Sequence, residues 1–284
     1  MIESGCILTI VCPDRKGIVA AVSRFLFERD CNIVESTQFG DRGTDKFFLR
    51  ILFSAGEGAS IEALQREFVP IASSFAMSAS FHAEAAKTRA LIMVSRLGHC
   101  LVDLLYRWRI GALPIEIAGV VSNHQDFADV AAAHGTPFHY LPVDKASKAR
   151  QEEALSAIVH AERVELIVLA RYMQILSPAF CSLMRGRVIN IHHSFLPSFK
   201  GARPYHQAHE RGVKLIGATA HYVTEDLDEG PIIEQGVERV THAMSPADLA
   251  AIGRDVETVV LARAVRWHAE HRVLLNGART VVLA

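Results

Sequence analysis

The chain has 284 residues, enough for one large domain or two moderate ones. Half of its residues are apolar and 21% are charged, which is typical of a globular protein with a sizeable core. The net charge of −1 and the lack of a basic run argue against a nucleic-acid partner. No apolar run reaches the roughly 18–20 residues of a membrane span, and the N-terminus lacks a signal-peptide pattern. We therefore expect a cytoplasmic protein with neither nucleic-acid nor membrane partners.

The five cysteines do not form a pattern typical of disulfides or of zinc sites. Their number is odd, and no two are spaced as in a CxxC pair. Because free cysteine behaves as a small apolar residue, buried free thiols are the expectation. The cysteines are Cys6, Cys12, Cys31, Cys100 and Cys181.

The first segment, residues 1–84, has strand and helix patterns in the order βαββαβ. Strands are predicted at residues 7–11, 32–39, 47–53 and 77–81. Two helices are predicted from apolar stripes at Ile18, Val22, Phe25 and Leu26, and at Ile61, Leu64, Phe68 and Ile71. This order predicts a ferredoxin-like domain, in which two helices cover one face of an antiparallel sheet.

Residues 85–89 carry little that could enter a core, so we expect a short linker there and a second domain at residues 90–284. Strands are predicted at residues 90–95, 115–121, 137–141, 166–170, 187–191 and 214–223. Helices are predicted between several of them, at residues 99–109, 126–134 and 148–161. This alternation predicts a doubly wound, mostly parallel α/β sheet, which binds ligands beyond the carboxyl ends of its strands. The expected rim is Ser95-Arg96, Ser122-Asn123, residues 171–176 and residues 190–194.

The last long helix, at about residues 245–270, has the pattern of a scaffold. Its predicted buried stripe is Leu249, Ile252, Val256, Val259, Val260 and Ala264. Residues 272–275 and 280–283 are expected to add a small closing hairpin. The first βα turn, SRLGH at residues 95–99, has one glycine, which disfavours a dinucleotide site.

Polar groups suited to acid–base chemistry gather between residues 188 and 230. Asn190 and His192 are two apart on a predicted strand, so they share a face and could both bind one carbonyl oxygen. Asp228 lies in an acidic turn that ends at Gly230, and we expect it opposite that pair, with a raised pKa that suits a base. An oxyanion donor, an imidazole and a carboxylate favour attack on a small carbonyl group. Pro197 and Pro204 are expected to bound a stiff loop beside them.

Other interpretations of the same residues stay open at this point. A strand ending in NIHH could be structural, and most of the acidic turn could simply be solvated. A metal site on His192, His193, His221 and Asp228 is disfavoured because no helical HxxxH occurs there. Ser194 as a hydrolase nucleophile is disfavoured because no GxSxG motif surrounds it.

The sequence CPDRKG at residues 12–17, which ends the first strand, resembles that of an ACT domain. The resemblance implies a small-molecule sensor, often for amino acids, and a homo-oligomer. Asp14 is expected to cap the following helix, with the amides of Lys16 and Gly17 at its positive end to bind a carboxylate. The possible effector residues are Asp14, Lys16, Gly17 and Asn32. A dimerisation module that binds no ligand is the alternative.

Three motifs in order resemble the folate-dependent formyltransferase family: LARYMQILSP at 169–178, NIHHSFLPSFKGARPYHQA at 190–208 and GATAHYVTEDLDEGPIIEQ at 217–235. With the ACT-like segment, the whole chain is most similar to members that hydrolyse 10-formyltetrahydrofolate to tetrahydrofolate and formate. The resemblance implies that Asp228 activates water and that Asn190 and His192 stabilise the oxyanion. It implies no metal and no organic cofactor.

The resemblance also assigns folate-binding residues. They are Tyr172, Met173, Gln174, Ile175, Leu176, His221, Thr224, Glu225, Asp226 and Leu227. The family's amine-accepting members have a Gly/Ser-rich first turn that binds a phosphate, and SRLGHC departs from it, which favours water as the acceptor. Formyl transfer to an amine is one alternative, and a catalytically inactive folate- or amino-acid-binding regulator is another.

Overall fold

The computed structural model describes residues 5–56, 60–144, 148–194 and 204–284, and the chain divides into two compact units. The first unit consists of Met1–Ala86 together with Glu270–Ala284, and the second is Lys87–Ala269. The predicted stiff loop after Pro197 lies outside the described residues. Among the described residues, no helix combines the length and apolar character needed to cross a bilayer.

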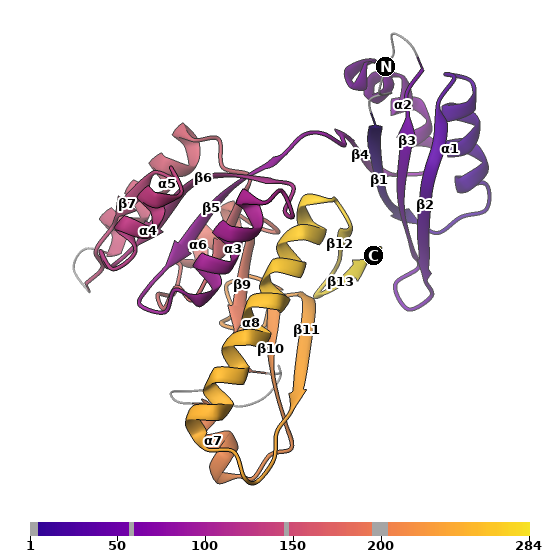
Figure 1. Cartoon of the computed structure of the whole chain (residues 1–284). Helices are drawn as coiled ribbons and strands as arrows, with labels where there is room; N and C mark the ends of the chain where they lie inside the picture. The colour runs from indigo at the N-terminus through magenta and orange to yellow at the C-terminus, as the bar shows by residue number, and fades with distance from the viewer. Residues whose placement is uncertain (1–4, 57–59, 145–147, 195–203) are drawn as a thin grey trace. The chain divides into compact units, whose positions relative to one another are not determined.

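The first unit has the predicted βαββαβ order, with a four-stranded antiparallel sheet in the order β2-β3-β1-β4 (Figure 1). Its elements are β1 (Gly5–Pro13), α1 (Ile18–Phe27), β2 (Asn32–Asp41), β3 (Lys46–Ser54), α2 (Ile61–Ser74) and β4 (Ser78–Ala83). The ferredoxin-like fold expected from the sequence is therefore confirmed.

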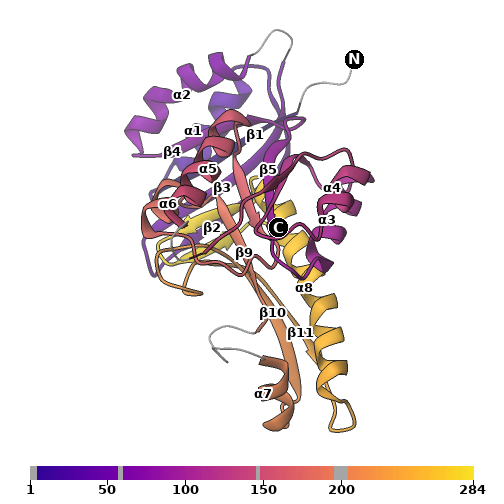
Figure 2. The ribbon, with the colours of Figure 1, turned by 90° about the vertical axis from the view of Figure 1, so that its left-hand side faces the viewer.

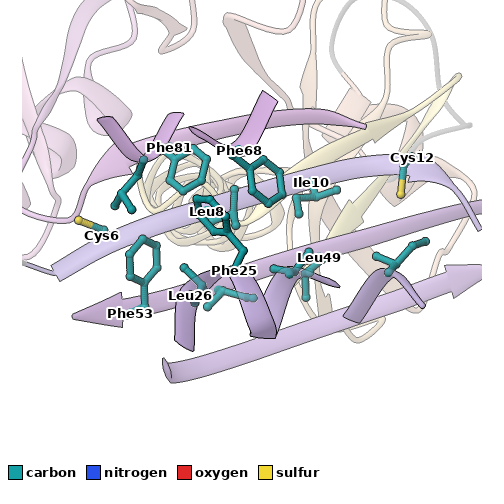
Figure 3. Close-up of a cluster of buried hydrophobic side chains, with 14 of the residues drawn as sticks. Cys6, Leu8, Ile10, Cys12, Phe25, Leu26, Leu49, Phe53, Phe68 and Phe81 are labelled. Atoms are coloured by element: carbon teal, nitrogen blue, oxygen red, sulfur yellow. The ribbon is translucent and has the colours of Figure 1, made fainter. Parts of the chain in front are cut away.

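The core of this unit lies between the two helices and one face of the sheet. All four predicted stripe residues of α1 are buried, as are Leu64 and Phe68 of α2. Figure 3 shows Leu8, Phe25, Phe53, Phe68 and Phe81 gathered together in this layer. The Phe68 ring packs edge-on against Phe25 at 5.0 Å and against Phe81 at 5.5 Å between centroids. The apolar residues that alternate along the strands and those that recur every 3.6 residues along the helices thus pack together in one layer.

The C-terminal hairpin, β12 (Val273–Asn276) and β13 (Arg279–Val282), belongs to the first unit, whereas the sequence assigned it to the second domain. Arg272 donates hydrogen bonds to both carboxylate oxygens of Glu35 in β2, at 2.9 and 3.3 Å. Asn276 donates to Asp41 at 2.6 Å, at the other end of β2. These polar contacts are made between residues more than 200 positions apart, so local patterns in the sequence give no sign of them.

The second unit contains a seven-stranded sheet in the order β11-β10-β9-β8-β5-β6-β7. Strands β5 to β9 run parallel, and β10 pairs antiparallel with both β9 and β11, which confirms a mostly parallel sheet. The elements are β5 (Thr88–Val94), α3 (His99–Arg109), β6 (Ile115–Ser122), α4 (Ala128–Ala133), β7 (Phe138–Tyr140), α5 (Lys148–Ala161), β8 (Leu166–Leu169), α6 (Pro178–Leu183), β9 (Val188–His192), α7 (Pro204–Glu210), β10 (Leu215–Tyr222), β11 (Ile232–Arg239) and α8 (Pro246–Ala269). Elements α6, α7 and β11 are additions to the sequence prediction.

The long helix α8 packs along β10 and β11, and Figures 1 and 2 show it beside these strands in both views. Gly236 of β11 allows this approach, because a Cβ atom there would lie 2.6 Å from a methyl group of Val260. Val256 and Val260 are buried as predicted, but Val259 is 42% exposed, so that part of the stripe was wrong. Glu257 occupies the buried face with only 1% of its surface exposed.

Candidate active site

One cavity of about 260 Å³ lies beyond the carboxyl ends of β8 and β9 in the second unit. All thirteen residues that the sequence assigned to catalysis and folate binding line it. They are Asn190, His192, Asp228, Tyr172, Met173, Gln174, Ile175, Leu176, His221, Thr224, Glu225, Asp226 and Leu227. The rule that open α/β sheets bind ligands beyond strand ends therefore located the cavity correctly.

The three predicted catalytic side chains converge at one end of this cavity. Nδ1 of His192 lies 3.2 Å from one carboxylate oxygen of Asp228, and Nε2 of His221 lies 3.7 Å from the other. The amide nitrogen of Asn190 lies 3.3 Å from the same Nε2 of His221. The structure thus brings an amide, two imidazoles and a carboxylate into one connected group.

Hydrogen-bond partners determine which nitrogen of each imidazole carries the proton. An ionised Asp228 only accepts hydrogen bonds, so Nδ1 of His192 is the donor. Nδ1 of His221 lies 2.9 Å from the carbonyl oxygen of Tyr222 and therefore also carries a proton. Nε2 of His192 is buried and has no hydrogen-bond partner among the described residues. This nitrogen is therefore available to a substrate.

Strand pairing and one strained residue hold this geometry in place. Asn190 and His221 are directly opposite each other in the antiparallel pair of β9 and β10. Asp228 has a left-handed backbone, with φ of 57°, an uncommon conformation for a residue other than glycine that is often found at functional sites. Gly230 follows, where a Cβ atom would collide with the carbonyl oxygen of Tyr222. The turn that carries Asp228 is therefore pressed closely against the end of β10.

The pKa of Asp228 is lowered, so the raised value predicted from partial burial is wrong. The hydrogen bond from His192 and then the nearby imidazole of His221 lower this pKa, and together they outweigh the effect of burial, which raises it. The sequence placed one imidazole near Asp228 but not two. Asp228 is consequently an anion at neutral pH, held between two imidazoles.

Apart from His221, the predicted folate-binding residues lie in two other segments of the lining, residues 172–176 and 224–227. Met173, Ile175 and Leu227 are each 60% exposed, so large apolar side chains surround the opening. Tyr172 is buried instead, and its hydroxyl accepts a hydrogen bond from Gln151 at 3.0 Å. Exposed apolar side chains beside a polar interior suit a flat aromatic ligand with a polar reacting group.

Two of the four predicted rim turns do not line the cavity. Ser95-Arg96 and Ser122-Asn123 are absent from its described lining. Ser95 nevertheless supports the cavity wall, because its hydroxyl oxygen accepts a hydrogen bond from the amide of Met173 at 3.0 Å. The Ser95 hydroxyl in turn donates to the side-chain oxygen of Asn123 at 2.7 Å.

Arg171 and His193 also line the cavity, as the predicted rim at residues 171–176 and 190–194 implies, but the sequence assigned neither of them to catalysis or folate binding. The His193 ring stacks on the His192 ring, with centroids 5.0 Å apart. Burial, followed by the charge of Arg171, lowers the pKa of His193 to about 4, so it is neutral at physiological pH. Their positions after the ends of two strands predicted that they lie at the rim, but not that the two side chains act on each other there.

The predicted effector residues lie in the first unit and do not all come together. Asp14, Lys16 and Gly17 are exposed at the start of α1, whose N-cap is Gly17 with φ of 96°. No side chain caps this helix, so the predicted capping by Asp14 is wrong. Asn32 begins β2, opposite Ser54, whereas the Asp14 side chain lies against Gly40 near the other end of β2. At about 3.3 Å per residue, Asn32 is too distant to share a small ligand with Asp14 within one chain.

Comparisons with known proteins identify relatives of both units of the chain. The formyl transferase family model matches residues 88–265, and the ACT domain family model matches residues 7–68. A formyltetrahydrofolate deformylase of Corynebacterium sp. is 52% identical over 279 residues, covering 98% of this chain and 97% of the relative. The crystal structure of a formyltetrahydrofolate deformylase from Burkholderia mallei is 54% identical, with a TM-score of 0.95 over 99% of this chain and 100% of that one. Glycinamide ribonucleotide transformylase 1 from Symbiobacterium toebii is 31% identical, with a TM-score of 0.66 over 72% of this chain and 97% of that one.

The lowered pKa of Asp228 predicts how stability depends on pH. A carboxyl group with a depressed native pKa stabilises the fold above its unfolded value of about 3.9, and this contribution is lost as pH falls through the native value. Asp228→Asn should therefore lower the free energy of unfolding by about 1–3 kcal/mol near pH 6. Urea unfolding of both proteins should show the difference shrinking between pH 4 and pH 2. The exposed neighbour Asp226, as Asp226→Asn, is the control, and a difference that grows on acidification would contradict the assignment.

Proposed function

Because this chain belongs to the formyltetrahydrofolate deformylase family, we propose that it hydrolyses 10-formyltetrahydrofolate to tetrahydrofolate and formate at the cavity of the second unit. One observation carries the assignment of residues: His192 is held by Asp228 through Nδ1, while its buried Nε2 has no partner among the described residues. An imidazole positioned in this way is ready to exchange a proton or a hydrogen bond with a substrate atom.

In the first step, Asp228 binds and orients a water molecule beside the formyl carbon. The water oxygen forms a bond to that carbon while Asp228 accepts one of its protons. Negative charge develops on the formyl oxygen, which receives hydrogen bonds from the amide nitrogen of Asn190 and from protonated Nε2 of His192. Before it accepts the proton, the ionised Asp228 stabilises the positive charge of that imidazole through Nδ1, so the oxyanion donor is already charged when the attack begins.

In the second step, the tetrahedral species collapses. The carbon–nitrogen bond breaks, and a proton passes from His192, directly or through water, to the departing folate nitrogen. Formic acid leaves as formate after its remaining proton is lost to solvent. Asp228 then releases its proton to solvent and Nε2 of His192 takes one up, which restores both groups. Side chains of this chain and water carry all of these proton transfers, and we propose that the reaction needs neither a metal nor an organic cofactor.

The folate is proposed to occupy the other end of the cavity. Residues 172–176 and 223–227 both line the cavity, and the apolar side chains of Met173, Ile175 and Leu227 are its exposed part. Backbone groups of the second segment suit the polar edge of a pterin, and the apolar side chains suit its ring faces. Binding at this end would place the formyl group against Asn190 and His192.

The alternative function is formyl transfer to an amine, the type of reaction named for the more distant structural relative. The first βα turn distinguishes the two, because SRLGHC offers one glycine for a backbone cradle around an acceptor's phosphate. That turn is also absent from the described lining of the cavity. These observations favour water as the acceptor.

Hydrolysis without an acceptor is the direct test. The purified protein should release formate from 10-formyltetrahydrofolate with no amine present, and Asp228→Asn should lower kcat/KM by about 10²–10⁴. Asn190→Ala should lower it by about 10²–10³ through loss of an oxyanion donor. Glu229→Gln, an exposed neighbour in the same turn, is the matched control and should retain activity. Unchanged turnover in Asp228→Asn would place the chemistry elsewhere, and strict dependence on an added amine would favour the transferase.

We propose further that the first unit binds a small amino acid and joins copies of the chain into a homo-oligomer. The ACT match supports both roles. The uncapped N-terminus of α1, with Lys16 beside it, would bind the carboxylate. Strand β2 lies at the edge of its sheet, with Val34 64% exposed, which suits pairing between copies.

A cytoplasmic location is also proposed, since all five cysteines are free, as is usual in a reducing compartment.

The effector proposal separates two residues that the sequence grouped together. Equilibrium dialysis with labelled glycine or methionine should show binding that Lys16→Ala weakens and that Asn32→Ala leaves intact, because Asn32 lies at the other end of β2. Sedimentation velocity on the same samples should give a mass above that of a 31.2 kDa monomer. Equal losses in both variants would contradict this placement, and a monomeric mass would contradict the oligomer.

A further inference from the structure

A buried polar cluster lies behind the catalytic end of the cavity. Glu257 of α8 is 1% exposed, and one of its oxygens lies 2.7 Å from Nε2 of His99. Its other oxygen accepts a hydrogen bond from the hydroxyl of Tyr205 at 2.8 Å. Nε of Arg171 lies 3.5 Å from the first oxygen. Burial of Glu257 opposes its ionisation, but His99 and Arg171 outweigh it and lower its pKa, so the cluster contains an anion.

The helix is shaped to hold this cluster. Gly253 lies one turn before Glu257, on the same face of α8. A Cβ atom at position 253 would collide with the hydroxyl of Tyr205, so glycine leaves the space in which Tyr205 reaches Glu257. Burying a carboxylate costs free energy unless the charge is paired. The three partners of Glu257 therefore indicate that this cluster fixes the position of a side chain.

Arg171 connects this cluster to the cavity. It follows the end of β8, lines the cavity and is only 10% exposed. The ion pair with Glu257 is its one polar side-chain contact within the described part of the chain, and its Nε has no hydrogen-bond partner there. Its backbone is left-handed, with φ of 64°, which is strained for arginine. A strained, buried cation is therefore held at the wall beside His193, whose pKa it also lowers.

We propose that Arg171, positioned by Glu257, determines the acceptor: it closes the cavity behind the catalytic residues and so admits water but excludes primary amines. The inference rests on the proposed hydrolysis and deepens it. Arg171 is a specificity residue at the cavity wall, and Glu257 is a positioning residue that acts through it.

The geometry of attack supports this role. The folate is proposed to fill the end of the cavity between residues 172–176 and 223–227. An acceptor must therefore enter where the folate is not. Of the described lining residues given no part in catalysis or folate binding, the strongly polar ones are His193, whose ring stacks on that of His192, and Arg171. Water needs room for one oxygen atom at this point, whereas an amine also needs room for the carbon chain behind its nitrogen.

The positive charge of Arg171 disfavours amines as well, in addition to the limit on their size. Most primary amines are cations at neutral pH, and bringing one beside a buried guanidinium carries an electrostatic penalty that water does not meet. The neutral His193 offers no compensating negative charge. Asp228 does attract cations, but two imidazoles already lie beside its oxygens and share its charge.

A metal site is the competing interpretation of the same cluster, since His99, Cys100 and Glu257 have ligand atoms within 4.8 Å of one another. Burial, followed by the charge of Glu257, raises the pKa of the Cys100 thiol, which therefore stays protonated and is a poor ligand. Arg171 already lies against the carboxylate, where it would repel a metal cation. The cluster is better suited to holding an arginine.

The test removes the arginine without straining the backbone. Glycine adopts a φ of 64° readily, so Arg171→Gly opens the wall and also relieves strain.

In the assay, formyl-folate is supplied with methoxyamine, which is neutral at pH 7, or with ethylamine, which is cationic. In transfer, the amine nitrogen bonds to the formyl carbon, the folate nitrogen leaves, and the amine proton passes to it. Formate and the N-formyl product are both measured, with an enzyme-free reaction as background.

Wild type should give formate almost alone, and Arg171→Gly should raise the ratio of N-formyl product to formate at least 10-fold, more strongly for methoxyamine. Glu257→Gln should raise the ratio by a smaller factor because Arg171 then loses its ion pair. Arg163→Gly is the matched control: it is the same substitution at a left-handed residue, with φ of 50°, outside the cavity lining, and it should leave the ratio unchanged.

The outcomes separate this inference from the proposed function. If wild type releases no formate, the proposed hydrolysis fails, whatever the variants do. If wild type and Arg171→Gly both hydrolyse and the product ratio stays the same with both amines, the role of Arg171 is overturned while hydrolysis stands. Should Arg171→Gly fail to fold, Arg171→Asn is used, since asparagine also tolerates a left-handed backbone, and the same two ratios decide.

Discussion

The hydrogen bond between Nδ1 of His192 and Asp228 is the interaction on which the rest of the site depends. It keeps the carboxylate ionised, it determines which nitrogen of the imidazole carries a proton, and it leaves Nε2 available in the cavity. His221 supports the same carboxylate from the neighbouring strand. Without an anion at this point, both imidazoles would lose their common partner, and the Asn190 amide is connected to it only through His221.

The fold brings these groups together by pairing strands of opposite direction. Strand β9 ends the parallel part of the sheet, and antiparallel β10 returns beside it, so His221 comes to lie across from Asn190. The turn after β10 then brings Asp228 back to His192 in a left-handed backbone conformation. On the other side of the cavity, α8 supplies Glu257, which ties Arg171 to the helix layer. The sheet therefore carries the catalytic groups, and the helix supports the wall behind them.

Local patterns in the sequence predicted the elements and the cavity well, because periodicity and strand ends depend on neighbouring residues. The apolar stripe of α1 and the shared face of Asn190 and His192 are examples. Features that depend on distant residues were not predictable in the same way. A second imidazole lowers the pKa of Asp228, Glu257 is paired with residues from three other segments, and the C-terminal hairpin joins the first unit through Glu35. A charge on the apolar face of α8 was the one visible sign of the Glu257 cluster.

The central claim is that an ionised Asp228 holds His192 with its proton on Nδ1. Nitrogen NMR of the protein with 15N-labelled histidine measures this directly, with His192→Gln used to assign the signal. At neutral pH the His192 signals should show a protonated Nδ1 that is coupled to its hydrogen, and Asp228→Ala should weaken or remove that coupling. A neutral His192 with its only proton on Nε2, unchanged in Asp228→Ala, would contradict the account.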